Sequence, residues 1–234
     1  MFAGVHRGFS PDRFSDAIDS SAEDQHLDAE RSWNYELGTR MQPLNCLKTD
    51  VTLFYYDYQN KVTAASASSG VTSVNAGATV HKGVEFDLRV DWDKLWKLNY
   101  SFYSKIAYSF IDLEQNSGAT EGKDLNYAPN QLLNFQAGVE AKNGWGAYVE
   151  AVFVDKMFDD LNNTVEVSAD GSLGIIPSHT VWNLALNYTH PTKEWMAYLK
   201  VVNVFDNEYI SSRNSQGIFA GPFRQIYLGV KTEF

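Results

Sequence analysis

Apolar and polar residues alternate one by one along much of this chain. In the segment GVEFDLRVDW, residues 83–92, one phase holds Val84, Phe86, Leu88, Val90 and Trp92, and the other holds Gly83, Glu85, Asp87, Arg89 and Asp91. Successive side chains of a strand point to opposite sides of a sheet, so this pattern predicts a strand with one apolar and one charged face. Similar alternation occurs at 2–9, 33–41, 48–60, 98–112, 133–141, 145–155, 182–188, 195–206 and 226–234. The pattern predicts an all-β chain of about ten strands, and no amphipathic helix competes with it.

The connections between these segments alternate in length. Short ones lie at 43–45, 93–97, 142–144 and 190–193, and long polar ones lie at 10–30, 61–74, 114–130, 159–178 and 209–222. This rhythm indicates an antiparallel up-and-down meander with all long loops at one end. Bacterial outer-membrane barrels have that asymmetry, whereas soluble sandwiches use mixed Greek-key connections.

A strand with one apolar and one charged face fits two architectures. One is a soluble sandwich with an apolar core, and the other is a membrane barrel with a charged lumen. Three features favour a transmembrane β-barrel. Segment 98–112 is long enough to cross a bilayer at a tilt, for which about 9–11 residues suffice. The chain ends on Phe234, which alternates in step with the apolar residues of the last strand. Aromatic residues lie at strand ends, as they do in the interfacial girdles of membrane barrels. The strand-end aromatics are Trp33, Trp92, Tyr100, Trp145, Tyr188 and Trp195.

The barrel interpretation predicts where the side chains lie. We expect the aliphatic set on the convex outer face, exposed in the chain by itself, and the charged set on the concave side. The aliphatic set comprises Phe86, Leu88, Val90, Leu133, Phe135, Leu184, Leu186, Leu228 and Val230, and the charged set comprises Glu36, Arg40, Glu85, Asp87, Arg89, Gln136 and Glu140. Packing of the aliphatic set against a second sheet would exclude a barrel.

Composition excludes several classes of function for this chain. Aromatic residues make up 14% of the 234 residues, and no run of about 18 apolar residues is present to span a bilayer as a helix. The net charge of -10 argues against nucleic acid as a partner, because nucleic-acid binding needs a basic footprint. Neither the five histidines nor Cys46 form a metal-ligand or nucleophile–base pattern, so we expect no enzyme activity, metal or cofactor. The opening MFAGVHRGFS lacks signal-peptide features, which indicates either a cytosolic protein or a piece of a longer one.

Five segments carry a resemblance to a known family: VHRGFSP at 5–11, ERSWNYELGTR at 30–40, NAGATVHKGVEFDL at 75–88, KVVNVFDNEYISSR at 200–213 and the closing IYLGVKTEF. In order and spacing they are similar to the final strands of the 22-stranded barrel of TonB-dependent outer-membrane receptors. Within that family, residues 162–177 and 214–228 most resemble the ferric dicitrate receptor branch. The resemblance implies that residues 1–234 are a C-terminal barrel portion, with a plug domain and upstream strands outside the chain.

The same resemblance implies a function and its partners. The parent would bind an iron chelate, with ferric citrate suggested by the branch, and import it across the bacterial outer membrane with TonB-coupled energy. Its partners would be the ferric chelate, the TonB complex through the plug, and outer-membrane lipid and lipopolysaccharide. The alternatives are a receptor for another siderophore, haem or cobalamin, a passive porin-like barrel, and a soluble sandwich that serves as a binding module.

The resemblance places ligand contacts on the long loops. An anionic ferric citrate needs arginine and amide donors, and the last long loop offers Arg213, Asn214, Gln216 and Arg224. The GIFAG register matches Asn214 to a ligand-contacting asparagine of the family. The acidic loop 10–30 and the Ala- and Ser-rich loop 61–74 would fold over the chelate. In the second loop Ser66 stands where the branch would have a longer amide, a departure that counts against ferric citrate.

The terminal Phe234 has two interpretations. Its phase predicts a packing role in the aromatic girdle at the periplasmic rim, a contribution of about 1–2 kcal/mol. The family resemblance implies a second role, as the terminal aromatic by which the outer-membrane assembly machinery recognises its clients.

Overall fold

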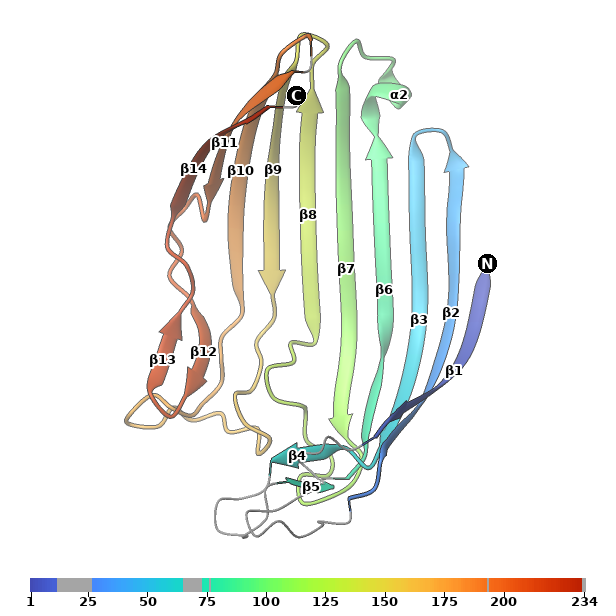
Figure 1. Ribbon diagram of the computed structural model, residues 1–234, viewed down its shortest axis with the longest axis vertical. Coiled ribbons are helices and arrows are strands. Elements are labelled where there is room, and N and C mark those ends of the chain that lie inside the picture. Colours follow the sequence, from blue (N-terminus) through green and yellow to red (C-terminus); the bar gives the residue numbers. More distant parts are fainter. Residues whose placement is uncertain (12–26, 65–72, 76, 193, 233–234) are drawn as a thin grey trace.

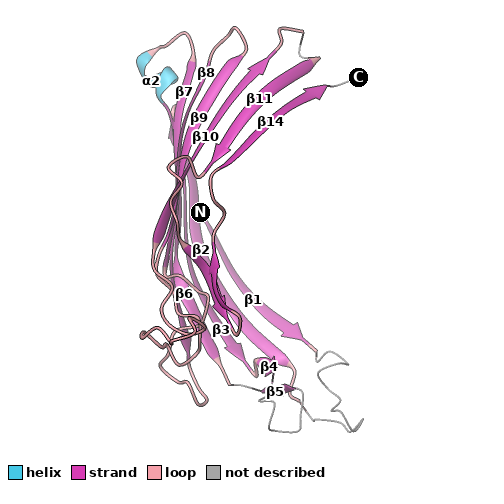
Figure 2. Ribbon diagram, turned by 90° about the vertical axis from the view of Figure 1, so that its left-hand side faces the viewer, coloured by secondary structure: helices cyan, strands magenta, loops and turns pink. Residues whose placement is uncertain are grey.

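A computed structural model of the chain describes residues 1–11, 27–64, 73–75, 77–192 and 194–232. Ten antiparallel strands lie side by side in one sheet, in the order β1-β2-β3-β6-β7-β8-β9-β10-β11-β14 (Figure 1). Their bounds are β1 Phe2–Ser10, β2 Glu30–Leu44, β3 Leu47–Gln59, β6 Thr79–Asp91, β7 Ser101–Gln115, β8 Gln131–Glu140, β9 Trp145–Val154, β10 His179–Thr189, β11 Trp195–Val202 and β14 Gln225–Thr232. The sheet is open, with β1 and β14 at its edges, and it is curved in profile (Figure 2). The predicted meander of ten strands is confirmed.

Short and long connections separate to opposite ends of the sheet, as predicted. The short connections lie at the upper end of Figure 1, here called the turn end, and the long ones lie at the lower end, here called the loop end. Two hairpins that the alternation did not indicate lie within long connections. They pair β4 (Val62–Ala64) with β5 (Ser73–Asn75), and β12 (Ile210–Asn214) with β13 (Gly217–Ala220).

A five-residue helix, α2 (Trp92–Trp96), forms the connection between β6 and β7. The strand prediction is therefore wrong at Trp92, which begins the helix instead of ending the strand. Asp93 in the first turn suits the positive end of the helix, and Lys97 ends it in the left-handed conformation with its N–H bonded to the Asp93 carbonyl. Within the described residues, no helix has the length and apolarity to cross a membrane.

Strand register keeps the apolar and charged phases on opposite faces of the sheet. Phe86 pairs with Val51 on one side and Tyr108 on the other, while Asp87 pairs with Asp50. All nine residues of the predicted aliphatic set lie on one face of the sheet, here called the aliphatic face. All seven residues of the charged set lie on the other, here called the charged face. The two-faced interpretation of the alternation therefore extends across the whole sheet.

The aliphatic face has no partner layer. Leu228 and Val230 are 78% and 68% exposed, and the other sheets among the described residues are two-stranded hairpins. The positions nearer the centre of the sheet, such as Phe86 and Leu133, are half-buried by neighbours on the same face, so they are less exposed than predicted. The few buried apolar residues in the described part are Val80, Leu125, Ile176 and Ala185. A soluble sandwich needs a packed core between two sheets, and the residues that the structure describes form none.

Aromatic rings form two bands on the aliphatic face. Near the turn end the Tyr188 ring lies 5.0 Å from Trp145 and 5.6 Å from Trp195, measured between ring centroids. Toward the loop end Tyr35 lies 6.4 Å from Trp33. Two such bands agree with the predicted interfacial girdles. Phe234 lies outside the described residues, so its place in the turn-end band stays a prediction.

Glycine lies opposite an aromatic ring in four cross-strand pairs of the charged face. The pairs are Phe2–Gly38, Phe54–Gly83, Tyr103–Gly138 and Tyr198–Gly229. At Gly38, Gly138 and Gly229 the ring occupies the space that a glycine Cβ would fill, and at Gly83 the Phe110 carbonyl oxygen lies even closer to that position than the Phe54 ring does. The absence of a side chain therefore lets the ring lie against the neighbouring strand.

We expect Gly138→Ala to lower the free energy of unfolding by about 1–3 kcal/mol, as overpacking does. The new methyl group would lie 2.5 Å from Cζ of Tyr103 and would displace the ring. Urea titration of the full-length protein refolded into lipid vesicles measures the change. In a Tyr103→Ala background the same methyl group should cost much less, and an equal cost in both backgrounds would contradict the explanation.

Candidate functional site

Two long connections, residues 116–130 and 155–178, are joined by hydrogen bonds at the loop end of the sheet. Asn163, in the left-handed conformation, accepts a hydrogen bond from the Asp124 N–H at 2.8 Å and donates one to the Asp124 carbonyl at 3.0 Å. The buried Asp159 carboxylate accepts a hydrogen bond from the Gly174 N–H at 3.0 Å. Fully buried Ile176 forms an antiparallel bridge with Met157. These bonds satisfy loop backbone groups internally and make residues 155–178 an ordered platform.

The tip of the platform is a turn built around Asp170. Its Oδ1 accepts hydrogen bonds from the hydroxyls of Ser168 and Ser172 at 2.6 and 2.8 Å, and from the Ser172 N–H at 3.1 Å. These bonds, led by the one from Ser168, lower the pKa of Asp170 to about 2. The carboxylate is thus held in its charged form, and its hydrogen bonds close the turn.

Arg213 joins the β12–β13 hairpin to this platform. Its side chain is buried, with the residue 3% exposed, and Nη1 donates to the Gly171 carbonyl at 2.8 Å. Nη2 donates to the Ile175 carbonyl at 3.4 Å, and the Arg213 carbonyl accepts from the Tyr127 hydroxyl. The guanidinium therefore holds two loops together. The predicted ligand contact of Arg213 stays a prediction, and it would require these bonds to open.

Asn214 and Gln216 lie exposed at the tip of the same hairpin. The Asn214 Oδ1 accepts a hydrogen bond from the Gln216 N–H at 2.8 Å, and Gly217 completes the turn with a φ of 107°. Within the described part of the chain, the Asn214 Nδ2 has no hydrogen bond, and neither does the side-chain amide of Gln216. Both side chains can donate to an incoming carboxylate.

Arg224 lies at the base of the hairpin, just before β14. Its N–H donates to Asp206 Oδ1 at 2.8 Å, and its Nη2 lies 3.6 Å from Asp206 Oδ2. The structure thus brings Arg213, Asn214 and Gln216 together on one hairpin and keeps Arg224 apart from them. Ser66 lies outside the described residues, as do most of loop 10–30 and of loop 61–74.

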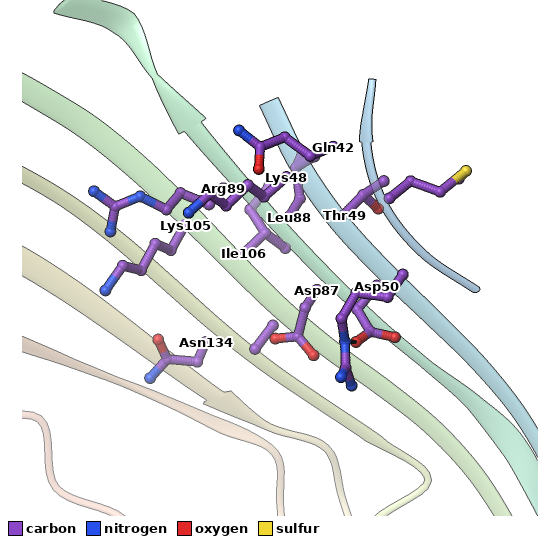
Figure 3. Close-up of a pocket in the computed structure, with 13 residues that line it drawn as sticks. Gln42, Lys48, Thr49, Asp50, Asp87, Leu88, Arg89, Lys105, Ile106 and Asn134 are labelled. Atoms are coloured by element: carbon purple, nitrogen blue, oxygen red, sulfur yellow. Dashed lines mark hydrogen bonds and ion pairs between the residues drawn. The ribbon is translucent and has the colours of Figure 1, made fainter. Parts of the chain in front are cut away.

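A groove that the sequence alone did not reveal crosses the charged face near the turn end. It has a volume of about 520 Å³ and is lined by residues of β2, β3, β6, β7 and β8 (Figure 3). Arg40 forms an ion pair with Asp50 at 2.5 Å. Lys48 lies opposite Arg89, which in turn lies opposite Lys105. Alternation alone places Arg40 and Arg89 on this face, but the row of three cations appears only with the strand register.

Comparison with known proteins agrees with this architecture. Residues 1–204 match the family described as "TonB dependent receptor-like, beta-barrel". The ferric citrate transporter FecA in its unliganded form is 28% identical, with a TM-score of 0.69, over 86% of this chain and 30% of that one. The ferric-catecholate import receptor Fiu from E. coli K12 is 19% identical, with a TM-score of 0.71, over 99% and 32%. The ferric enterobactin receptor PfeA from Pseudomonas aeruginosa is 16% identical, with a TM-score of 0.76, over 99% and 38%.

These similarities differ in how much they show about this chain. The chain spans about a third of the length of the three receptors, and the two with lower identity share its fold alone. The higher identity to FecA is consistent with the ferric citrate branch. Proteins of this family are transporters of the bacterial outer membrane, which is consistent with the expectation that the chain is not an enzyme. The family match extends over most of the sheet, and the chain belongs to the TonB-dependent receptor β-barrels.

Proposed function

We propose that this chain is the C-terminal barrel portion of an outer-membrane receptor that imports an iron chelate with TonB-coupled energy. The family match over residues 1–204 supports this proposal, as does the 28% identity to a solved ferric citrate transporter. The aliphatic face between two aromatic bands suits the hydrocarbon layer of a bilayer. Its contacts with lipid and lipopolysaccharide, and coupling to TonB through a plug, are parts of the same proposal.

Ferric citrate is the chelate that we propose. The observation that carries this choice is the 28% identity to the ferric citrate transporter, against 19% and 16% for the catecholate and enterobactin receptors. The exposed amides of Asn214 and Gln216 add hydrogen-bond donors that suit a carboxylate ligand. No cofactor is needed, because the iron enters as part of the bound substrate.

Uptake of radiolabelled iron tests the proposal. We expect the full-length receptor to restore ferric citrate uptake in cells that lack their own ferric citrate receptor, and only when TonB is present. Ferric enterobactin, another siderophore, haem and cobalamin serve as rival substrates, and restored uptake of one of these instead would replace ferric citrate. Uptake that persists without TonB would indicate a passive pore.

The hairpin tip provides a binding prediction. We expect Asn214→Ala and Gln216→Ala each to raise the Kd for ferric citrate about fivefold, because one neutral hydrogen bond contributes about 1 kcal/mol. Equilibrium binding to the full-length receptor in detergent measures the change. Asn116→Ala removes an exposed amide from another loop and should leave the Kd unchanged. An unchanged Kd in the double Asn214→Ala, Gln216→Ala variant would remove the hairpin tip from the ligand site.

A further inference from the structure

We propose that Lys48, Arg89 and Lys105 form a second, deeper anion-binding site, which a polycarboxylate ligand contacts as it passes along the charged face. This inference rests on the proposed function, because it concerns the path of an anionic chelate. It adds a site at the turn end of the sheet to the expected recognition site on the loops.

The row is unfavourable unless an anion joins it. Lys48, Arg89 and Lys105 occupy directly opposed positions on three neighbouring strands. Strands lie about 4.8 Å apart, so the three backbone positions span roughly 10 Å. Like charges directly opposite one another on neighbouring strands destabilise a sheet. A bound anion would remove that repulsion.

Carboxylates of the chain neutralise this row only in part. Arg89 Nε lies 2.7 Å from Asp91 Oδ1, but the same carboxylate also pairs with Lys94 at 2.6 Å. Neither Lys48 nor Lys105 has an ion pair in the described residues. The groove is lined by four cations (Arg40, Lys48, Arg89 and Lys105) and two carboxylates (Asp50 and Asp87), an excess of two positive charges. The chain as a whole has a net charge of -10, so this excess is local.

The Tyr103 ring contacts two of the three cationic groups, Arg89 and Lys105. The Arg89 guanidinium lies 4.7 Å from the centroid of the Tyr103 ring, and Lys105 Nζ lies 5.2 Å from the same centroid. Asp91 engages only the Nε of Arg89 in a hydrogen bond, which leaves the two terminal nitrogens for a bidentate contact with a carboxylate. Figure 3 shows Arg89 and Lys105 extending in the same direction over the groove.

The position and size of the groove point to a small polycarboxylate in transit. Lys48 is the second residue of β3, and Gln59, at the loop end of that strand, lies 11 positions further along the chain. That separation corresponds to roughly 35 Å of strand, so the row is far from the hairpin that carries Asn214. A groove of about 520 Å³ has room for a small chelate, and three cations across it match several carboxylate groups.

Uptake and binding assays on the full-length receptor test the inference. We expect the double variant Lys48→Gln, Lys105→Gln to reduce the rate of ferric citrate uptake about fivefold at subsaturating concentration, since a cleft of one charge raises the local concentration of an oppositely charged ligand. The Kd measured in cells without TonB should stay unchanged, because the loops make that contact. Lys48→Arg with Lys105→Arg should keep normal uptake. The control Lys97→Gln, Lys142→Gln removes two exposed lysines outside the groove and outside the loop-end platform, and should also leave uptake normal.

The outcomes separate this inference from the proposed function. Normal ferric citrate uptake by both the wild type and the double glutamine variant would overturn the inference alone. Reduced uptake accompanied by lower thermal stability and a smaller amount of receptor in the membrane would also overturn it, because the lysines would then serve to hold a polypeptide segment. Absence of ferric citrate binding and uptake in the wild type would refute the proposed function and remove the ligand from this inference with it.

Discussion

Phe135→Arg should destabilise the membrane-inserted receptor by about 2–4 kcal/mol, the cost of a charged side chain on the lipid face of a barrel near the bilayer midplane. Phe135 lies on the aliphatic face, opposite Ile106 on β7 and Ala151 on β9. Its level is between the two aromatic bands, where the side chain cannot readily reach the headgroups. Denaturant titration of the full-length receptor in lipid vesicles measures the loss.

The next residue along the chain provides a matched control. Gln136 points to the charged face, opposite Lys105 and Glu150. Gln136→Arg adds the same side chain at the same depth, but in a polar setting where Glu150 on one side offsets Lys105 on the other, so its effect should stay within about 1 kcal/mol. Equal destabilisation by the two substitutions would show that lipid does not cover the Phe135 face.

Strands and their faces could be predicted from the sequence because both depend on a local pattern. A period of two in residues 83–91 defines a strand and its two faces without knowledge of any neighbour. The prediction failed at Trp92, because the apolar alternation continues to this residue although it begins a short helix that ends at Lys97. The β12 and β13 strands were missed because five and four residues are too few to show a period.

Site geometry could be predicted less well, because it depends on pairing between distant segments. Lys48 and Lys105 join Arg89 in one row only when the register of three strands is known. Arg213 was identified by residue type as a ligand candidate, but its bonds go to carbonyls 42 and 38 residues away in the chain. No spacing in the sequence encodes those contacts.

Arg213→Met should detach the β12–β13 hairpin from the platform of residues 155–178. The substitution keeps an unbranched side chain but removes two charge-assisted hydrogen bonds and leaves the Gly171 carbonyl without its buried donor. We expect the free energy of local opening to fall by about 2–3 kcal/mol. Amides of the platform, such as the Ile176 N–H that bonds to the Met157 carbonyl, should then exchange with solvent about 30- to 150-fold faster.

Hydrogen exchange by mass spectrometry on the full-length receptor measures this opening, and Arg224→Met is the matched control. Arg224 is half-exposed and its pair with Asp206 is 3.6 Å long, so its loss should change exchange in residues 168–176 very little. Ferric citrate affinity, measured on both variants, distinguishes the two roles of Arg213. Weaker binding together with faster exchange follows from a displaced hairpin. Weaker binding with unchanged exchange in residues 168–176 would instead make Arg213 a ligand contact, as the family resemblance implies, and would end its assignment as a link between the two loops.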